Sequence, residues 1–256
     1  MRVAAAAVQL ATTFGDVDGN LGRFADAVSG LDRDVDLIVT PELTNSGYDL
    51  DGIAARPDLA EPLDGPTVTL ARRLAADRQA TVVVGLLEDG GAGTTYDTAV
   101  VVSRQGAVTP YRKTHLYPPE TVRFTAGNEL VTVPDAAGHL GVLICFEHAF
   151  PELATALALR GARILAIPSA VPFGYEHVLH LRSRARAQDN QMFVVACNAV
   201  SDTFAGQSLI ADPRGRVLAQ AGDTEEVIHA ELDLTAVDAE RRREPALRLR
   251  RPELYS

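Results

Sequence analysis

Short runs of apolar residues recur along the chain and predict strands that are covered on both faces. The runs are Val3–Val8, Leu37–Val39, Thr81–Leu87, Ala99–Val102, Val142–Cys145, Ile164–Ile167 and Phe193–Cys197. Because few polar residues interrupt them, these runs are typical of sheets packed between other layers, not of sheets with one face in water.

Helical periodicity fills several of the intervals between these runs. The expected helices cover residues 20–31, 66–78, 151–160 and 176–191. Pro66 and Pro151 stand at the start of two of them, where the fixed φ of proline suits a first helical position. Strands alternating with helices in this way predict an α/β fold with sheets layered between helices.

Two further pairs of strands are expected to be antiparallel. The turn signal Arg104-Gln105-Gly106 separates one pair, and Pro213-Arg214-Gly215 separates the other. The paired segments are Tyr96–Ser103 with Ala107–Arg112, and Ser208–Asp212 with Arg216–Ala219.

Length and composition fit one globular domain. The chain has 256 residues, 46% of them hydrophobic and 23% charged, which is enough to bury a core without a metal or a disulfide. No linker divides it, so residues 1–256 are expected to form a single domain with an arginine-rich tail at 241–256. No run reaches the ~20 apolar residues of a membrane span, and the N-terminus lacks a secretory layout. Cys145 and Cys197 both lie in apolar stretches, so the expected location is the reducing cytoplasm.

The net charge of −10 argues against general nucleic-acid binding. The charge is uneven, because residues 241–251 hold six arginines and one glutamate and so carry +5, which leaves −15 on the rest. A basic segment of this kind is expected to form salt bridges to an acidic body or to a partner subunit.

The basic residues comprise 23 arginines and a single lysine, Lys113. Arginine and lysine are exchangeable at most surface positions. They are not exchangeable where a compact ammonium on a slim stem is needed. Lys113 is therefore a candidate for chemistry that arginine could not perform.

Cys145 ends the apolar run Gly141–Cys145 and precedes the helix predicted from Pro151. A sharp bend between strand and helix would lift the sulfur to the end of the sheet, as in a nucleophile elbow. Backbone N–H groups after the bend could stabilise an oxyanion. Cys197 lies within an apolar run and is expected to be a buried structural cysteine.

Glu42 and Lys113 also follow strands. Pro41 ends the run before Glu42, and Lys113 follows the strand predicted at Ala107–Arg112. A thiolate needs a nearby cation, and its proton needs an acceptor, and these two residues supply both. The three together indicate cysteine-based nucleophilic catalysis.

Three segments around these residues resemble the motif blocks of the nitrilase (carbon–nitrogen hydrolase) superfamily, in the same order. They are Pro41–Tyr48, Tyr111–Leu116 and Ile144–Glu152, and further blocks agree at Glu120 with Phe124 and Gly127, at 184–191, at 206–215 and at the ending 250–255. The resemblance implies a four-layer α-β-β-α sandwich, catalysis without a metal or cofactor, and homodimers or higher homo-oligomers.

The resemblance also implies roles for individual residues. Glu42 would be the general base, Lys113 would stabilise the tetrahedral intermediate, and Cys145 would be the nucleophile. Glu120 matches a second, assisting glutamate, and the backbone N–H of Phe146 would complete the oxyanion hole. The sequence departs from the usual pattern at Phe146-Glu147, where tyrosine-aspartate is more common, and in lacking a tryptophan at 171–180.

The expected reaction is hydrolysis of a small-molecule carboxamide to an acid and ammonia. Ureido (N-carbamoyl) compounds and nitriles remain alternatives, because the same triad serves all three. Candidate substrate-binding residues are Tyr48, Glu147, His148 and Phe173, and candidate carboxylate-binding residues are Arg123, Arg184 and Arg186.

Three other interpretations remain. Glu176, His177 and His180 suggest zinc, but the spacing differs from H-E-x-x-H and no third ligand is evident, so no metal is expected. A Cys–His pair of Cys145 with His148 or His139 would leave Lys113 unexplained. A non-catalytic binding or assembly member of the family is also conceivable, although the triad is complete.

Overall fold

A computed structural model describes residues 1–134 and 138–254, and its strands form two six-stranded sheets. The first sheet has the order β12-β1-β2-β3-β4-β5, and the second has the order β11-β10-β9-β8-β7-β6. The strands of the first sheet are β1 (Arg2–Gln9), β2 (Leu37–Val39), β3 (Thr81–Gly91), β4 (Thr94–Val102), β5 (Val108–Arg112) and β12 (Glu226–Asp233). Those of the second are β6 (Thr132–Val133), β7 (Leu140–Val142), β8 (Ile164–Ser169), β9 (Phe193–Asn198), β10 (Leu209–Ala211) and β11 (Val217–Gln220).

Both sheets are mixed. In the first, β1, β2 and β3 are parallel neighbours, and in the second, β7, β8 and β9 are parallel neighbours. The outer pairs are antiparallel. The carboxyl ends of the parallel strands therefore lead into loops at one edge of each sheet, which is where reactive side chains of α/β folds gather.

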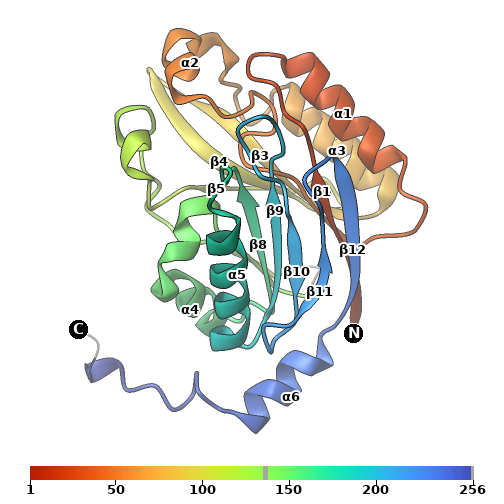
Figure 1. The fold of residues 1–256 in the computed structure, drawn as a ribbon, viewed down its shortest axis with the longest axis vertical. Coiled ribbons are helices and arrows are strands. Elements are labelled where there is room, and N and C mark those ends of the chain that lie inside the picture. The colour runs from red at the N-terminus through yellow and green to blue at the C-terminus, as the bar shows by residue number, and fades with distance from the viewer. Residues whose placement is uncertain (135–137, 255–256) are drawn as a thin grey trace.

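Helices cover the outer face of each sheet (Figure 1). On the first sheet lie α1 (Val17–Ser29) and α3 (Pro66–Arg78), and on the second lie α4 (Pro151–Leu159) and α5 (Glu176–Asn190). The shorter helices are α2 (Leu50–Ala55) and α6 (Thr235–Arg243), with single turns η1 (Pro57–Leu59), η2 (Pro118–Val122), η3 (Cys145–Ala149) and η4 (Pro252–Leu254). This is the four-layer α-β-β-α sandwich that the sequence resemblance implies.

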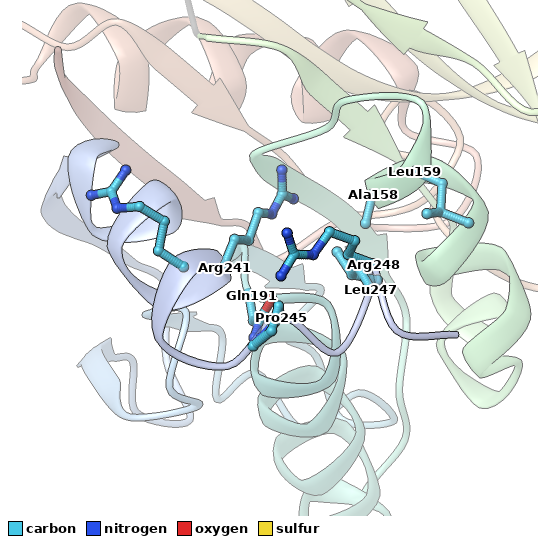
Figure 2. Close-up of a pocket in the computed structure, with 8 residues that line it drawn as sticks. Ala158, Leu159, Gln191, Arg241, Pro245, Leu247 and Arg248 are labelled. Carbon is cyan, nitrogen blue, oxygen red and sulfur yellow. The ribbon is translucent and has the colours of Figure 1, made fainter. Parts of the chain in front are cut away.

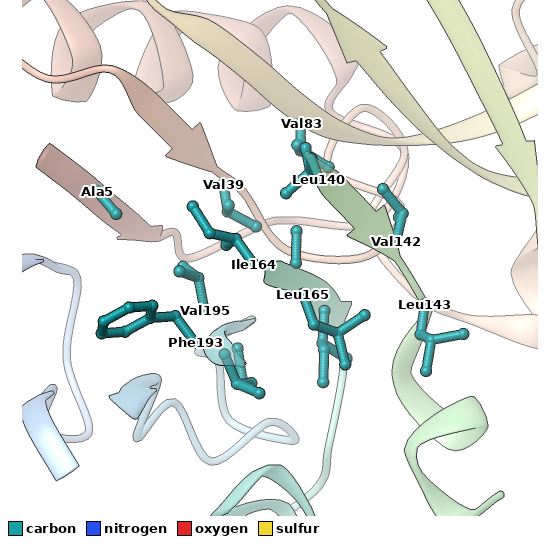
Figure 3. Packing of buried hydrophobic residues seen from close by; sticks show 14 of the residues in the cluster. Ala5, Val39, Val83, Leu140, Val142, Leu143, Ile164, Leu165, Phe193 and Val195 are labelled. Atoms are coloured by element: carbon teal, nitrogen blue, oxygen red, sulfur yellow. The ribbon is translucent and has the colours of Figure 1, made fainter. Parts of the chain in front are cut away.

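The alternation of side chains along β1 explains why its whole run is apolar. Ala5 and Ala7 belong to the core between the two sheets, whereas Ala6 and Val8 belong to the core under α1 and α3. The same central core takes Val39 and Val83 from the first sheet and faces residues of the second, such as Ile164 and Val195 (Figure 3). A strand buried on both faces has no position where a polar side chain would be solvated.

The main predicted helices and both hairpins are confirmed, with shifts of a few residues at some ends. One strand prediction was wrong in its bounds: β7 ends at Val142, and the apolar residues Leu143 and Ile144 are buried outside any ladder. The sequence predicted a strand here because both residues are apolar. Apolar side chains are favoured wherever the chain is buried, whether or not its backbone pairs with another strand.

The structure also contains elements that the sequence did not predict. β12 pairs along the full length of β1, yet only Ile228 and Leu232 of this strand are buried. α6 buries only Val237 and Glu240. Both elements lie at the edge of the fold, so their apolar pattern is weak. Among the described residues, no helix is long and apolar enough to cross a membrane.

Candidate active site

The side chains of Glu42, Lys113 and Glu120 meet in one buried cluster, next to Cys145. Glu42 follows β2, Lys113 follows β5 directly, and Glu120 lies on the single turn η2. Each of these three residues is 1% exposed. The topology thus brings together four of the residues that the sequence singled out, from segments more than 100 residues apart.

The backbone bends sharply at Cys145. Its φ is +41°, a left-handed conformation that non-glycine residues rarely adopt, whereas Ile144 before it is extended. Positive φ at a cysteine costs free energy, and such strain is concentrated at functional sites. The bend turns the chain from the end of β7 into η3 and then α4, and it leaves Cys145 only partly buried.

The Glu147 carboxylate holds this bend against the segment that carries Lys113. One oxygen, Oε2, accepts from the Ile144 amide at 2.8 Å, which clamps the bend itself. The other, Oε1, accepts from the Tyr111 hydroxyl at 2.7 Å and from both the amide and the hydroxyl of Thr114 at 2.8 and 2.6 Å. A fully buried carboxylate with this many donors is satisfied within the protein, so Glu147 joins the ends of the two sheets.

A close backbone approach positions Glu42. The Thr40 amide donates to Val83 O, and the Thr44 amide donates to Gly85 O, so the turn between them lies across β3. A Cβ at Gly85 would lie 2.2 Å from Pro41 O, which no real side chain tolerates. Glycine at position 85 is therefore required for Glu42 to reach the cluster.

The Lys113 ammonium is the centre of the cluster. Its Nζ lies 2.6 Å from Glu42 Oε1, 2.7 Å from Glu120 Oε1 and 3.0 Å from Asp97 Oδ2. These three carboxylates are also the one group among the described residues whose ligand atoms lie close enough to hold a metal ion. The Lys113 ammonium contacts one oxygen of each carboxylate. It therefore occupies the position that a metal ion bound by these three residues would take.

Glu120 is itself fixed by two further donors. Tyr48 donates its hydroxyl to Glu120 Oε1 at 2.7 Å, and the Tyr117 amide donates to Oε2 at 2.7 Å. Burial strongly raises the pKa of Tyr48, so its hydroxyl stays protonated and remains a donor. The Tyr48 hydroxyl thus contacts the same Glu120 oxygen as the Lys113 ammonium.

Burial sets the protonation of the cluster. Burial raises the pKa of Glu42 well above its usual value; Lys113 opposes the rise, while Asp97 and Glu120 add to it. Burial alone would lower the pKa of Lys113, but the three carboxylates outweigh it and raise that pKa. The cluster therefore favours the ammonium form of Lys113, and the Glu42 carboxyl group has an unusually strong proton affinity. The second carboxyl oxygen of Glu42, Oε2, is buried and has no hydrogen-bond partner.

The Cys145 sulfur is a thiol at rest. Burial and the negative charge of Glu42 raise its pKa, while Lys113 and a hydrogen bond from the Ala170 amide lower it, and the net shift is upward. A thiol with a raised pKa needs a base to become a nucleophile. The residue that perturbs it, Glu42, has the proton affinity to serve as that base.

Aromatic side chains line the approach to the bend. Phe146 contacts Tyr117 and Phe150 edge to face, with ring centroids 5.4 Å apart in each case. Its backbone amide is one of the first in η3, where amides have no partner within the helical turn.

The other candidate binding residues and the two histidines of the zinc interpretation differ in their burial and contacts. His148 is 2% exposed, and burial lowers its pKa to about 3, with Arg182 and Arg186 adding to the shift, so the ring is neutral. Phe173 is 50% exposed. His177 is exposed, and His180 contacts Gln207 O at 3.0 Å.

The three candidate carboxylate-binding arginines all hydrogen-bond to backbone carbonyl oxygens. The pairs are Arg123 with Leu50 at 3.0 Å, Arg184 with Gly215 at 2.8 Å and Arg186 with His148 at 3.2 Å. These contacts tie each guanidinium into the fold.

Asp97 was not among the residues predicted from the sequence. It lies inside β4, and it is the only charged residue of that strand. A charged side chain within an apolar strand must be paired when it is buried, so its position in the run could have signalled a partner.

Comparisons with known proteins identify the family of this chain. The model of the carbon–nitrogen hydrolase family matches residues 4–242. An (R)-stereoselective amidase from a Pseudomonas species is 39% identical over 241 residues, which cover 92% of this chain and 86% of that protein. The structure of Nit3 from Saccharomyces cerevisiae, a member of branch 10 of the nitrilase superfamily, has a TM-score of 0.88 at 32% identity, covering 95% of this chain and 94% of that one.

A further solved structure is that of an amidase. The amidase from Nesterenkonia sp. AN1, in a mutant that shows Michael addition of acrylamide at its active-site cysteine, has a TM-score of 0.86 at 26% identity, covering 99% of this chain and 98% of that one. Together, the match over nearly the whole chain and the shared fold show that this protein belongs to the carbon–nitrogen hydrolase family, the nitrilase superfamily of hydrolytic enzymes.

Proposed function

We propose that this enzyme hydrolyses a small-molecule carboxamide to a carboxylic acid and ammonia, with Glu42, Lys113 and Cys145 as its catalytic triad. The observation that carries the proposal is the buried ammonium of Lys113, held 2.6 Å from Glu42 Oε1, beside a cysteine in a strained bend. An acid, a cation and a thiol in this arrangement supply a base, an oxyanion donor and a nucleophile.

In the first half of the reaction, Glu42 accepts the thiol proton and the sulfur attacks the carboxamide carbon, forming a C–S bond. The oxyanion accepts hydrogen bonds from the Lys113 ammonium and the Phe146 amide. The C–N bond then breaks as Glu42 returns the proton to nitrogen, and ammonia leaves. A thioester on Cys145 remains.

In the second half, Glu42 takes a proton from water, and the resulting hydroxide attacks the thioester carbon. The C–S bond breaks, the carboxylic acid leaves and the proton returns to the sulfur. Glu120 holds Lys113 throughout, with Tyr48 donating to the same oxygen. Glu147 acts as a positioning residue, because both its oxygens are used within the protein.

A matched panel tests the class of substrate. Each set contains a carboxamide, a ureido acid and a nitrile with the same side chain, and ammonia release is measured for each. The carboxamides should give the highest kcat/KM. Preference for the ureido acids or the nitriles would assign the triad to those bonds, and no turnover of any member would contradict the proposal.

We infer further that the protein works in a reducing compartment such as the cytoplasm. Both of its cysteines are free thiols, and the proposed nucleophile is active only in that form.

Removal of metal ions is expected to leave turnover unchanged, because the Lys113 ammonium fills the point where the three carboxylates converge. The measurement is ammonia release before and after dialysis against EDTA, together with elemental analysis. Stoichiometric zinc with chelator-sensitive activity would contradict this prediction.

We also propose that the enzyme is a homodimer to which its basic tail contributes. The tail, the end of α4 and Gln191 line an open pocket of about 470 Å³, to which Arg241, Arg242 and Arg248 contribute (Figure 2). The Arg241 guanidinium ties α6 to the body by donating to Ala162 O at 2.8 Å, but Leu249 beyond it is 67% exposed. Residues 255–256 of the tail lie outside the described residues. A cationic segment with exposed leucine suits a second copy of an acidic chain.

Light scattering is expected to give about twice the chain mass of 27.3 kDa. Deletion of residues 244–256 should weaken the dimer, and high salt should have the same effect because the attraction is partly electrostatic. A fully active monomer would contradict the dimer, whereas an intact dimer after the deletion would contradict only the role of the tail.

A further inference from the structure

The Lys113 ammonium has a third carboxylate partner, Asp97, which stands outside the proposed triad and its assisting glutamate. Asp97 holds Lys113 at both ends: its backbone carbonyl accepts from the Lys113 amide at 2.9 Å, and its Oδ2 accepts from Nζ at 3.0 Å. The side chain is 1% exposed, and its other oxygen, Oδ1, is buried without a hydrogen-bond partner.

The charges of the cluster do not cancel. Three carboxylates surround one ammonium, which leaves a formal charge of −2 among side chains that are at most 1% exposed. A carboxylate oxygen of Asp97 lies within 4.8 Å of a carboxylate oxygen of Glu42. A second negative charge at that distance favours the protonated form of its neighbour.

We propose that Asp97 is a positioning residue for the amide hydrolysis proposed above: it fixes the Lys113 ammonium and, through its negative charge beside Glu42, makes Glu42 a stronger base toward the Cys145 thiol. Lys113 already holds Glu42 in place by charge and contact, and Glu120 holds the same ammonium. The distinct contribution of Asp97 is electrostatic, so it is separable from a role in packing.

Among the described residues, the charged groups placed against Asp97 belong to this site. They are Glu42 after β2, Lys113 after β5 and Glu120 on η2. Glu88 and Arg112 form a separate ion pair, and their side chains point to the opposite face of the sheet because they neighbour Leu87 and Lys113 in sequence.

Asp97→Asn tests the proposal because it keeps the shape and removes the charge. With one negative charge fewer, the pKa values of Glu42, Lys113 and Cys145 should all fall. The midpoint of the pH profile for alkylation of Cys145 by iodoacetamide is therefore expected to move to lower pH by about one unit, the size of shift that a single charge in the same site can produce. The acidic and basic limbs of kcat/KM for amide hydrolysis should move in the same direction, with a roughly tenfold loss at the plateau.

The control is Asp77→Asn on the exposed face of α3, which should move neither profile. Asp97→Glu keeps the charge and should keep the wild-type midpoint. An unchanged alkylation profile in folded Asp97→Asn would overturn the proposal, and so would failure of both Asp97 variants to fold, which would make Asp97 a support of the fold. Alkylation needs no substrate, so a shift without any amide hydrolysis would leave the role of Asp97 standing while the proposed function fails.

Discussion

Replacing Cys145 with alanine is expected to abolish ammonia release from carboxamides while leaving the fold intact. Removal of a covalent nucleophile costs roughly 10⁶-fold in kcat. Alanine retains the β-carbon and loses only the sulfur, and the clamp of Glu147 on the Ile144 amide does not depend on that sulfur. Steady-state ammonia release, measured beside a thermal melt, checks both parts of the prediction.

Cys197 provides the matched control. It is fully buried in β9, and its thiol donates to Val8 O at 3.2 Å. Burial raises its pKa, so it should neither react nor matter for turnover. Iodoacetamide followed by peptide mass mapping should modify Cys145 alone. Selective modification of Cys197 with loss of activity would reverse the assignment.

Lys113→Arg is expected to keep the fold and to lose at least two orders of magnitude in turnover. The swap conserves charge, so a purely electrostatic role would survive it. The Nζ, however, sits at 2.6–3.0 Å from three carboxylate oxygens in a fully buried site, and the wider guanidinium cannot occupy the same point. Loss of one oxyanion donor typically costs ~10²–10³ in kcat.

The neighbouring residue supplies the control for this exchange. Arg112→Lys makes the reverse swap one position earlier, where Arg112 pairs with Glu88 and lies 3.9 Å from the centre of the Tyr96 ring. That change should lower stability slightly and leave kcat nearly unaltered. Turnover close to wild type in Lys113→Arg would remove Lys113 from the mechanism.

The strands that are buried on both faces were the ones that could be predicted from the sequence. The runs that became β1, β8 and β9 were visible because both their faces are covered, so the sequence carries no polar interruption. β12 was not predicted, because it lies at a sheet edge and alternates buried residues with glutamate and histidine. Leu143 and Ile144 were predicted to belong to a strand because they are apolar. In the structure they are buried but lie beyond the end of β7 and pair with no strand.

The candidate site was predictable where a reactive residue lies within three residues of the end of a strand. Glu42, Lys113 and Cys145 each had this placement, and the family motifs added Glu120 and the Phe146 amide. The conformation of Cys145 itself, with φ at +41°, agrees with the bend that the sequence suggested.

The supporting residues were not predictable in this way. Glu147 accepts hydrogen bonds from Tyr111 and Thr114, which lie more than 30 residues away in the sequence. The residues around Glu147 contain no local pattern that predicts such contacts. Asp97 and Lys113 meet only because β4 and β5 pair in a particular register. Residues that act through tertiary contacts leave a trace in the sequence only as a polar side chain where an apolar one is expected.

Adding hydroxylamine to the reaction tests the central claim, a thioester on Cys145, most directly. Hydroxylamine competes with water for an acyl-enzyme and releases it as a hydroxamic acid. An amide and an ester of the same acid form the same acyl-enzyme, so the predicted result is an identical ratio of hydroxamic acid to free acid from both. Conversion of the amide to free acid alone, with no hydroxamic acid at any concentration of hydroxylamine, would show direct attack by water and contradict the account.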